Sequence, residues 1–234
     1  MAAEQFTIDP RIFERIPQLR IGVVVARGID NTASLDLSKE FAEQETRVLR
    51  DFEGIALAQY PVIRAWRDVY KSFGEKKNRS SVEALIRRTL NGKPVGSINA
   101  LVDLYNLLSL TYEMPSGGED LDAITEDIEL TLADGDESFI PLGGSGEEQN
   151  PKPGEIVYRS GKTVLCGSFN YRESDITKIT PQTTTVILCV EDILGNDRLP
   201  EATEALAQAV TTHLGGTTTT TILDTHNASA NLLH

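Results

Sequence analysis

The sequence predicts an α+β fold, a layered domain in which helices flank a mainly antiparallel system of strands. Three observations indicate this class. A β-branched run at residues 19–26 reads as a buried strand, and helical patterns fill most of the chain from there to residue 110. After residue 120 the pattern changes to short β-like pieces separated by turns, followed by one more helix and a last strand.

The chain is long enough, at 234 residues, to bury a substantial core as one domain. A glycine-rich acidic stretch at residues 143–154 resembles a linker. We interpret it as an exposed loop instead, because the β pieces before it are too few to complete a sheet alone. We therefore expect a single domain over residues 1–234.

Composition excludes several classes of protein. A formal net charge of -13 disfavours broad attraction to DNA or to an anionic membrane, although a local basic patch is compatible with it. No apolar run reaches the roughly 18 residues of a membrane span and no signal sequence opens the chain, so we expect a cytoplasmic protein without a membrane partner.

Cysteines and histidines give no catalytic or metal-binding signal. Cys166 and Cys189 lie in apolar runs without metal-type spacing, which favours reduced core cysteines. All three histidines lie at or after residue 213, which weakens triad and zinc-hydrolase interpretations. With no glycine-rich phosphate loop either, we expect no metal and no cofactor.

The elements of the first half are predicted in order. After the strand at 19–26, residues 35–51 form an amphipathic helix that Gly54 closes off. Pro61 opens a second helix that Gly74 caps, and we expect its Trp66 and Tyr70 in the core rather than on a stacking platform. Ser80 and Glu83 fit a capping box at the start of a third helix.

The second half is predicted to be mostly strands. The β-like pieces are residues 127–132, 138–142, 155–159, 162–166 and 183–190. Residues 199–214 then read as an alanine-rich helix, and the threonine-rich run 217–223 reads as the last strand. We expect the tail, residues 224–234, to be frayed.

Residues 98–120 are the most informative stretch. Apolar residues surround a helix at 98–110, while Asn99, Asp103 and Asn106 share one face at spacings of four and three, extended by Ser109. Buried polar groups need partners, so this stripe either braces neighbouring loops or forms the wall of a pocket. The helix leads into a predicted turn, Gly117–Asp120.

In the pocket interpretation, this turn carries chemistry. Gly117 and Gly118 present backbone amides to a ligand, and Glu119 and Asp120 bind an amine or activate water. Gly167, Ser168 and Asn170, in the turn at 167–172, either make ordinary turn contacts or line the mouth of the same pocket. A nucleophilic role for Cys166 is disfavoured because no histidine is near it in the sequence.

The densest basic patch precedes the third helix. It contains Lys76, Lys77 and Arg79, and Arg87 and Arg88 can add to it from later turns. Short charged runs are usually solvated loops. The alternative is an edge that binds RNA phosphates beside the free amides of a helix N-terminus.

Three segments, Arg79–Leu85, Asn99–Asn106 and Gly117–Asp120, resemble motifs of the B3/B4 domain family. This is the editing domain of the beta subunit of bacterial phenylalanyl-tRNA synthetase, and the match is closer to freestanding proteins made of that domain. The resemblance covers about residues 20–225. It implies a β-sandwich-like core with helical layers, shared in part with a domain of tRNA lysidine synthetase.

The resemblance also implies an activity, hydrolysis of the aminoacyl ester of a mischarged tRNA in trans, by water and without a covalent nucleophile. The implied partner is the 3' end of an aminoacyl-tRNA. Protein partners are not indicated. Catalytic candidates are Asn106, Gly117, Gly118 and Glu119, and candidate substrate-binding residues are Asn99, Asp103, Tyr105, Asn106, Asp120, Gly167 and Asn170.

Two departures from the synthetase motif concern specificity. Tyr105 stands where the synthetase has a threonine, and Gly117 stands where it has a histidine, so discrimination of tyrosine is not carried over. Aminoacylation by this chain alone is not expected, because the catalytic and anticodon-binding modules are absent. The alternative function is a noncatalytic module that binds tRNA or a small amino-acid-like or nucleotide ligand.

Overall fold

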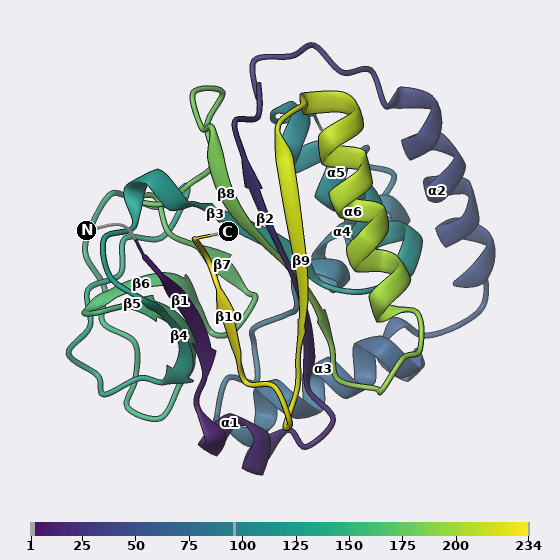
Figure 1. Cartoon of the computed structure of the whole chain (residues 1–234). Coiled ribbons are helices and arrows are strands. Elements are labelled where there is room, and N and C mark those ends of the chain that lie inside the picture. The colour runs from purple at the N-terminus through teal and green to yellow at the C-terminus, as the bar shows by residue number, and fades with distance from the viewer. Residues whose placement is uncertain (1–2, 96, 234) are drawn as a thin grey trace.

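Two β-sheets lie side by side, and helices cover the outer face of one of them (Figure 1). The computed structural model describes residues 3–95 and 97–233. This arrangement confirms the α+β class with mainly antiparallel sheets. The helices are α1 (Pro10–Arg15), α2 (Ser38–Asp51), α3 (Pro61–Ser72), α4 (Ser81–Leu90), α5 (Ala100–Tyr112) and α6 (Leu199–Leu214), with short 3-10 turns at Leu57–Gln59 and Leu121–Ala123.

The larger sheet has six strands in the order β10-β1-β4-β5-β6-β7, and the smaller sheet has four in the order β3-β8-β2-β9. Neighbouring strands run antiparallel except β1 and β4, which are parallel. The strands are β1 (Gln5–Ile8), β2 (Arg20–Arg27), β3 (Ser116–Asp120), β4 (Ile128–Leu132), β5 (Ile156–Ser160), β6 (Thr163–Gly167), β7 (Arg172–Glu173), β8 (Thr185–Asp192), β9 (Thr217–Leu223) and β10 (Ser229–Asn231).

The smaller sheet is the centre of the core. Its strand β2 is buried on both faces from Ile21 to Ala26, which explains its continuous apolar run. Helix α6 packs closely on this strand at Gly22, where an added Cβ would lie 1.8 Å from the Thr203 hydroxyl. Glycine at this position therefore allows the helix to approach the sheet.

The helices begin and end largely as their residues predict. Pro61 opens α3, and the Ser80 hydroxyl accepts a hydrogen bond from the Glu83 amide at the start of α4. Glu83 does not complete a reciprocal capping box, because its carboxylate instead binds arginines described below. Trp66 and Tyr70 are each 1% exposed, which confirms that they are core residues.

Four expectations about secondary structure were wrong. Residues 117–120 form most of β3 rather than a turn, because β8 supplies partners for their backbone. The tail is not frayed within its described part, since β10 pairs with β1 and Leu232 is fully buried. Residues 138–142 make isolated bridges and no strand, and Ile98 lies exposed before α5. Among the described residues, no helix combines the length and apolar character of a membrane span.

Candidate functional site

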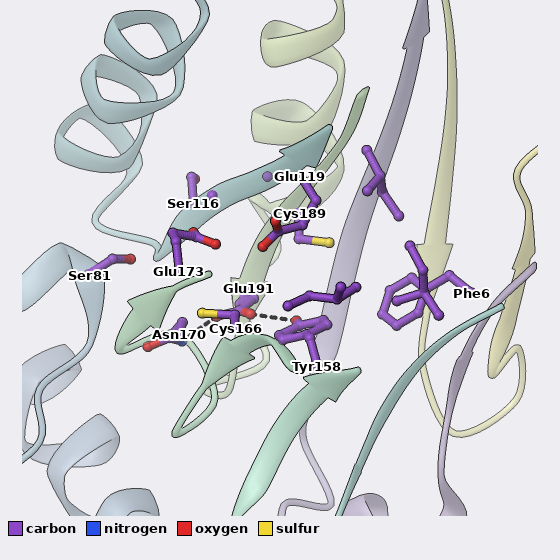
Figure 2. Close-up of a pocket in the computed structure, with 15 residues that line it drawn as sticks. Phe6, Ser81, Ser116, Glu119, Tyr158, Cys166, Asn170, Glu173, Cys189 and Glu191 are labelled. Atoms are coloured by element: carbon purple, nitrogen blue, oxygen red, sulfur yellow. Dashed lines mark hydrogen bonds between the residues drawn. The ribbon is translucent and has the colours of Figure 1, made fainter. Parts of the chain in front are cut away.

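A small cavity lies between the two sheets, and three glutamates line it (Figure 2). We call it the acidic cavity. The volume open to the centre of a water molecule is about 40 Å³, which is room for roughly three waters. Its lining residues are Phe6, Ser81, Ser116, Gly117, Gly118, Glu119, Ile128, Tyr158, Leu165, Cys166, Asn170, Glu173, Ile187, Cys189 and Glu191.

Strand alternation places one wall of the cavity. Every second residue of β8, namely Ile187, Cys189 and Glu191, points to the cavity face. In the neighbouring strand β3, Glu119 lies opposite Ile187 and Gly117 lies opposite Cys189, so both belong to the same face. The smaller sheet thus contributes two of the glutamates.

Pairing register places the opposite wall. Tyr158 of β5 pairs with Cys166 of β6, and Cys166 pairs with Glu173 of β7, so these three side chains form a row across the larger sheet. A Cβ at Gly117 would lie 2.7 Å from Glu173 Oε1. Glycine at 117 therefore leaves the space that the Glu173 carboxyl group occupies.

Glu191 is held by two donors. The Tyr158 hydroxyl donates to its Oε1 at 2.5 Å, and the Asn170 amide donates to its Oε2 (Figure 2). Asn170 is fixed in turn by the Tyr70 hydroxyl, which donates to its Oδ1 at 2.7 Å. Burial raises the pKa of Glu191 to about 7, although both hydrogen bonds act to lower it. Near neutral pH this carboxyl group is therefore present in both its protonated and its ionised form.

Glu119 and Glu173 are the other two glutamates of the acidic cavity, and they act as a pair. Their carboxyl groups lie within hydrogen-bonding reach of each other, and the Thr177 hydroxyl donates to Glu119 Oε2. Two carboxyl groups bond to each other only when one carries a proton. Burial raises the pKa of both, and the neighbouring Glu173 charge raises the pKa of Glu119 further. The pair therefore retains a proton where a solvated pair would lose both.

The two thiols in the acidic cavity are unreactive. Burial and then the carboxylates raise the pKa of Cys166 and of Cys189 well above the ordinary thiol range. Both sulfurs are reduced. A protonated thiol is a poor nucleophile, so the cavity contains no activated cysteine among its described lining residues.

A second hollow lies beside the start of α4 and is strongly cationic. We call it the cationic hollow. Lys76 and Lys77 in the loop before α4 and Arg64 on α3 are exposed and make no ion pair within the described residues. Its lining residues are Ala58, Arg64, Arg67, Lys71, Lys76, Lys77, Asn78, Arg79 and Arg87.

Glu83 anchors the arginines of the cationic hollow. Its fully buried carboxylate accepts hydrogen bonds from Arg67 at 2.7 and 3.0 Å and from Arg87 at 2.7 Å, and Arg79 lies 3.3 Å away. Burial by itself would raise the pKa of Glu83, but the hydrogen bonds from Arg67 and Arg87 outweigh burial and the pKa is lowered. One carboxylate thus gathers three guanidinium groups and leaves a net positive surface.

Comparison with known proteins identifies the family. The family model described as "B3/4 domain" matches residues 65–196, which is more than half of the chain. The chain belongs to the B3/4 domain family. Among solved structures, it is similar to an N-terminal fragment of the phenylalanyl-tRNA synthetase beta-subunit from Pyrococcus horikoshii, with a TM-score of 0.45, 14% sequence identity, 93% of this chain covered and 51% of that chain. No curated protein matches.

The polar stripe of α5 stabilises loops of this B3/4 domain rather than lining the acidic cavity. Asn99 caps the helix by accepting from the Val102 amide at 3.0 Å, and it also accepts from the Asn31 amide at 3.2 Å. Asp103 accepts from the Ser97 hydroxyl at 2.8 Å and from the Ile98 amide at 3.0 Å. Both residues lie outside the cavity lining.

The remaining candidates of the α5 and β3 region divide into two groups. Gly117, Gly118 and Glu119 line the acidic cavity. Tyr105 and Asn106 are half-buried on α5 and are not among the lining residues. Asp120 accepts from the Asp122 amide at 3.0 Å and from the Thr183 hydroxyl at 2.6 Å, which caps the short turn after β3.

The turn after β6 contributes one cavity residue. Asn170 lines the acidic cavity, whereas Gly167 and Ser168 line a separate hollow on the outer side of the turn. Ser168 and Phe169 adopt positive φ angles of 49° and 64°, an uncommon backbone for such residues. Phe169 is fully buried against Trp66, with ring centroids 5.2 Å apart, and this packing holds the turn that presents Asn170.

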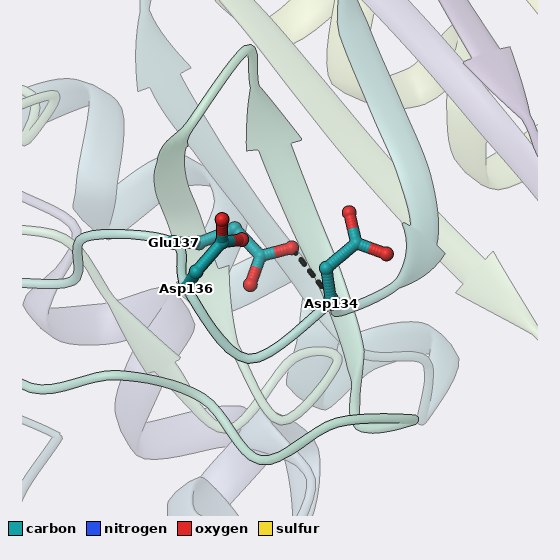
Figure 3. A group of neighbouring side chains, drawn as sticks. All are labelled: Asp134, Asp136 and Glu137. Atoms are coloured by element: carbon teal, nitrogen blue, oxygen red, sulfur yellow. Dashed lines mark hydrogen bonds between the residues drawn. The ribbon is translucent and has the colours of Figure 1, made fainter.

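A cluster of acidic side chains elsewhere, Asp134, Asp136 and Glu137, has the spacing of metal ligands (Figure 3). Its charges already have partners. The Glu137 carboxylate accepts from the amides of Asp134 and Gly135, and Arg159 donates to it at 2.8 Å. Lys162 pairs with Asp136 at 2.6 Å. These contacts account for the cluster as a structural part of the loop before β5.

Sequence reasoning missed Tyr158, Glu173 and Glu191. A signal for Glu191 exists in the sequence, because a glutamate continues the inward alternation of Ile187 and Cys189 in an apolar strand. No comparable signal exists for Glu173. It reaches the cavity through the irregular turn after β6, and its strand β7 has only two residues.

Proposed function

We propose that this B3/4 domain binds the aminoacylated 3' end of a tRNA and hydrolyses a mischarged aminoacyl ester in trans. One observation carries the proposal. Glu191, a buried carboxyl group whose pKa is raised to about 7, lines a water-sized cavity, and the linings of this cavity and of the cationic hollow both include residues at the start of α4.

Glu191 has the properties of a general base for ester hydrolysis. A general base is most effective when its pKa lies near the working pH, and that of Glu191 is about 7. Tyr158 and Asn170 hold the carboxylate in one orientation and leave acceptor positions for a water molecule. The water would attack the ester carbonyl carbon, its proton would pass to Glu191, and the ribose oxygen would leave and take up a proton. No covalent intermediate on the protein is required.

The two hollows match the charges of an aminoacyl-tRNA end. Ser81 in the first turn of α4 lines the acidic cavity, while Arg79, two residues earlier, lines the cationic hollow. Phosphates lying on Lys76, Lys77 and Arg79 would place a terminal group within reach of the acidic cavity. The net charge of -13 makes this local positive surface the favourable place for an RNA strand.

A panel of mischarged tRNAs tests the proposal. We expect the protein to deacylate at least one member, and Glu191→Gln to lower kcat by roughly 100-fold or more, the usual contribution of a general base. Glu204→Gln, an exposed glutamate on α6, is the matched control and is expected to retain full activity. Absence of deacylation of every member at micromolar protein, or an unchanged rate for Glu191→Gln, contradicts the proposal.

The cationic hollow is tested separately from the chemistry. Replacing both Lys76 and Lys77 by glutamate should raise KM most at low salt and make KM less dependent on salt, while kcat at saturating tRNA stays near that of the unmodified protein. A fall in kcat with unchanged KM contradicts this assignment of the two lysines.

A second candidate is a noncatalytic module that binds a small amino-acid-like or nucleotide ligand. The size of the acidic cavity, about 40 Å³, favours the amino-acid-like ligand of this alternative, because it accommodates a small polar group but neither a large side chain nor a nucleotide. This alternative is supported if tRNA does not bind at low salt while a free amino acid raises the melting temperature.

A further inference from the structure

Three buried polar atoms converge on the acidic cavity without hydrogen-bond partners. They are Ser81 Oγ, Ser116 Oγ and Glu173 Oε2, and all three residues line the cavity. Ser116 is 5% exposed. Figure 2 shows both serines beside Glu173, on the opposite side from Phe6. Buried polar atoms are nearly always paired, so three orphans around one cavity indicate a site for a polar ligand group.

The three atoms are suited to a donor with three hydrogens. A carboxylate oxygen only accepts hydrogen bonds, and each serine hydroxyl can accept one. A primary ammonium group offers three N–H donors and no acceptor. Its charge is matched by the carboxyl groups of Glu119 and Glu173, whereas an anionic ligand would meet only like charge in this cavity.

The dimensions of the cavity agree with this chemistry. Room for roughly three waters is enough for an ammonium group and the carbon that bears it. Apolar side chains, Phe6, Ile128 and Leu165, complete the lining and suit that carbon. A quaternary ammonium ion is larger and has no N–H donor.

We propose that the acidic cavity is a binding site for a primary ammonium group, with Glu173 as the counter-ion and Ser81 and Ser116 as the orienting acceptors. Identifying this group as the α-ammonium of an aminoacyl ester rests on the proposed function. The ammonium site itself is independent of RNA. It would fix the amino end of the ligand and leave the ester beside Glu191.

Binding is coupled to the proton of the Glu119–Glu173 pair. An ammonium group favours the fully ionised pair, so the shared proton leaves to the buffer when the cation enters. The titratable groups that act on or around Glu173 come from five other strands and helices, and they are Tyr105, Glu119, Tyr158, Cys166, Cys189 and Glu191. None of these groups is a cation, so none of them can balance the charge of the two carboxylates in place of the ligand.

Small amines test the site on the full chain without RNA. L-alaninamide and methylammonium should bind saturably, raise the melting temperature by roughly 2–4 °C at high occupancy, and release protons in calorimetry repeated in two buffers near pH 7. N-acetyl-L-alaninamide lacks the charge, and tetramethylammonium lacks N–H donors, so neither should bind. Equal binding of either control overturns the proposal, and equal binding of potassium assigns the site to alkali metal cations instead.

Variants test two of the three site residues, Glu173 and Ser116. Glu173→Gln should weaken L-alaninamide binding at least tenfold, Ser116→Ala should weaken it severalfold, and Glu204→Gln should leave it unchanged. Because Ser116→Ala removes only one hydroxyl, it keeps the test valid if Glu173→Gln fails to fold. Unchanged affinity in both Glu173→Gln and Ser116→Ala contradicts the proposal.

The two proposals can fail separately. If amines bind while no mischarged tRNA is deacylated, the ammonium site stands and the hydrolytic function falls. If an aminoacyl-tRNA that the protein deacylates is hydrolysed at the same rate after N-acetylation of its amino group, the function stands and the ammonium site falls.

Discussion

Glu119 and Glu173 come from different sheets, and their carboxyl groups lie within hydrogen-bonding reach of each other inside the acidic cavity. Such a pair is unfavourable when both groups are ionised, because two like charges then share a poorly hydrated site. A retained proton relieves this repulsion between Glu119 and Glu173, and the Thr177 hydroxyl donates a further hydrogen bond to Glu119. The two sheets are therefore joined at this point by a contact whose strength depends on pH.

The free energy of unfolding should fall as pH rises from about 5 to about 8. Glu191 has a pKa of about 7 in the folded chain against 4.5 when solvated, so the folded state binds more protons between these values. Its contribution is fully present below 4.5 and is lost as pH passes 7, a change of roughly 3 kcal/mol at most. Urea unfolding across this range measures it.

Glu191→Gln provides the control for this slope, because an amide does not titrate. The variant should show a shallower decline, with the remainder due to Glu119 and Glu173. Asp9 acts in the opposite direction, since its pKa is lowered to about 2, but its stabilisation is lost only below pH 4 and lies outside the window. An identical slope in Glu191→Gln contradicts the assignment.

Glu83→Gln should lower the free energy of unfolding by about 2 kcal/mol. The variant removes the common acceptor of Arg67 and Arg87 from a fully buried position, while the arginines themselves can still reach water. It also removes one negative charge beneath the cationic hollow, so the net positive charge there rises by one. We therefore expect tighter binding of single-stranded RNA at low salt, measured by fluorescence anisotropy, and stability unchanged by the substitution would contradict the role of Glu83 as an anchor.

Gly22→Ala should destabilise the chain by about 2–3 kcal/mol through overpacking between β2 and α6. The new Cβ would lie 1.8 Å from Thr203 Oγ1, and the backbone around both residues is fixed by a sheet and a helix. Adding Thr203→Ala should recover part of the loss, since it removes the closest atom. Thermal unfolding of both single variants and the double variant measures the coupling, and strict additivity would disprove the steric contact.

Leu232→Ala should cost about 3 kcal/mol, whereas Leu233→Ala should change stability by less than about 0.5 kcal/mol. Leu232 is fully buried beside β10, while its neighbour Leu233 is 46% exposed. The two variants remove the same side chain at adjacent positions, so composition and helix or strand propensity are matched. Equal melting temperatures would show that the end of the chain frays in solution.

Regular patterns in the sequence predicted regular elements well. The helix at residues 199–214 and the strand at 217–223 have the bounds expected from periodicity, a proline near the start and two glycines between them. Strands β1 and β10 were missed because each is short and lacks a long apolar run. Their pairing joins the two ends of the chain, and no local pattern carries information about such a distant partner.

Prediction of the candidate site was limited in a similar way. The polar stripe of α5 has good spacing, yet Asn99 and Asp103 bind backbone and side-chain groups of nearby loops, an arrangement that periodicity cannot distinguish from a pocket wall. Gly117, Gly118 and Glu119 were found because glycines allow backbone amides to approach a ligand closely, beside acidic side chains that can bind an amine or activate water. Glu173 and Glu191 become neighbours only when the larger sheet packs on the smaller one.

A series of contacts connects strand β10 to the candidate site. Ala230 of β10 pairs with Phe6, the Phe6 ring lies 5.7 Å from the Tyr158 ring, and Tyr158 donates to Glu191. Removal of β10 is therefore expected to disturb the contact between Phe6 and Tyr158 and, through it, the orientation of Glu191. Assays of hydrolysis need a preparation that retains β10 and Leu232.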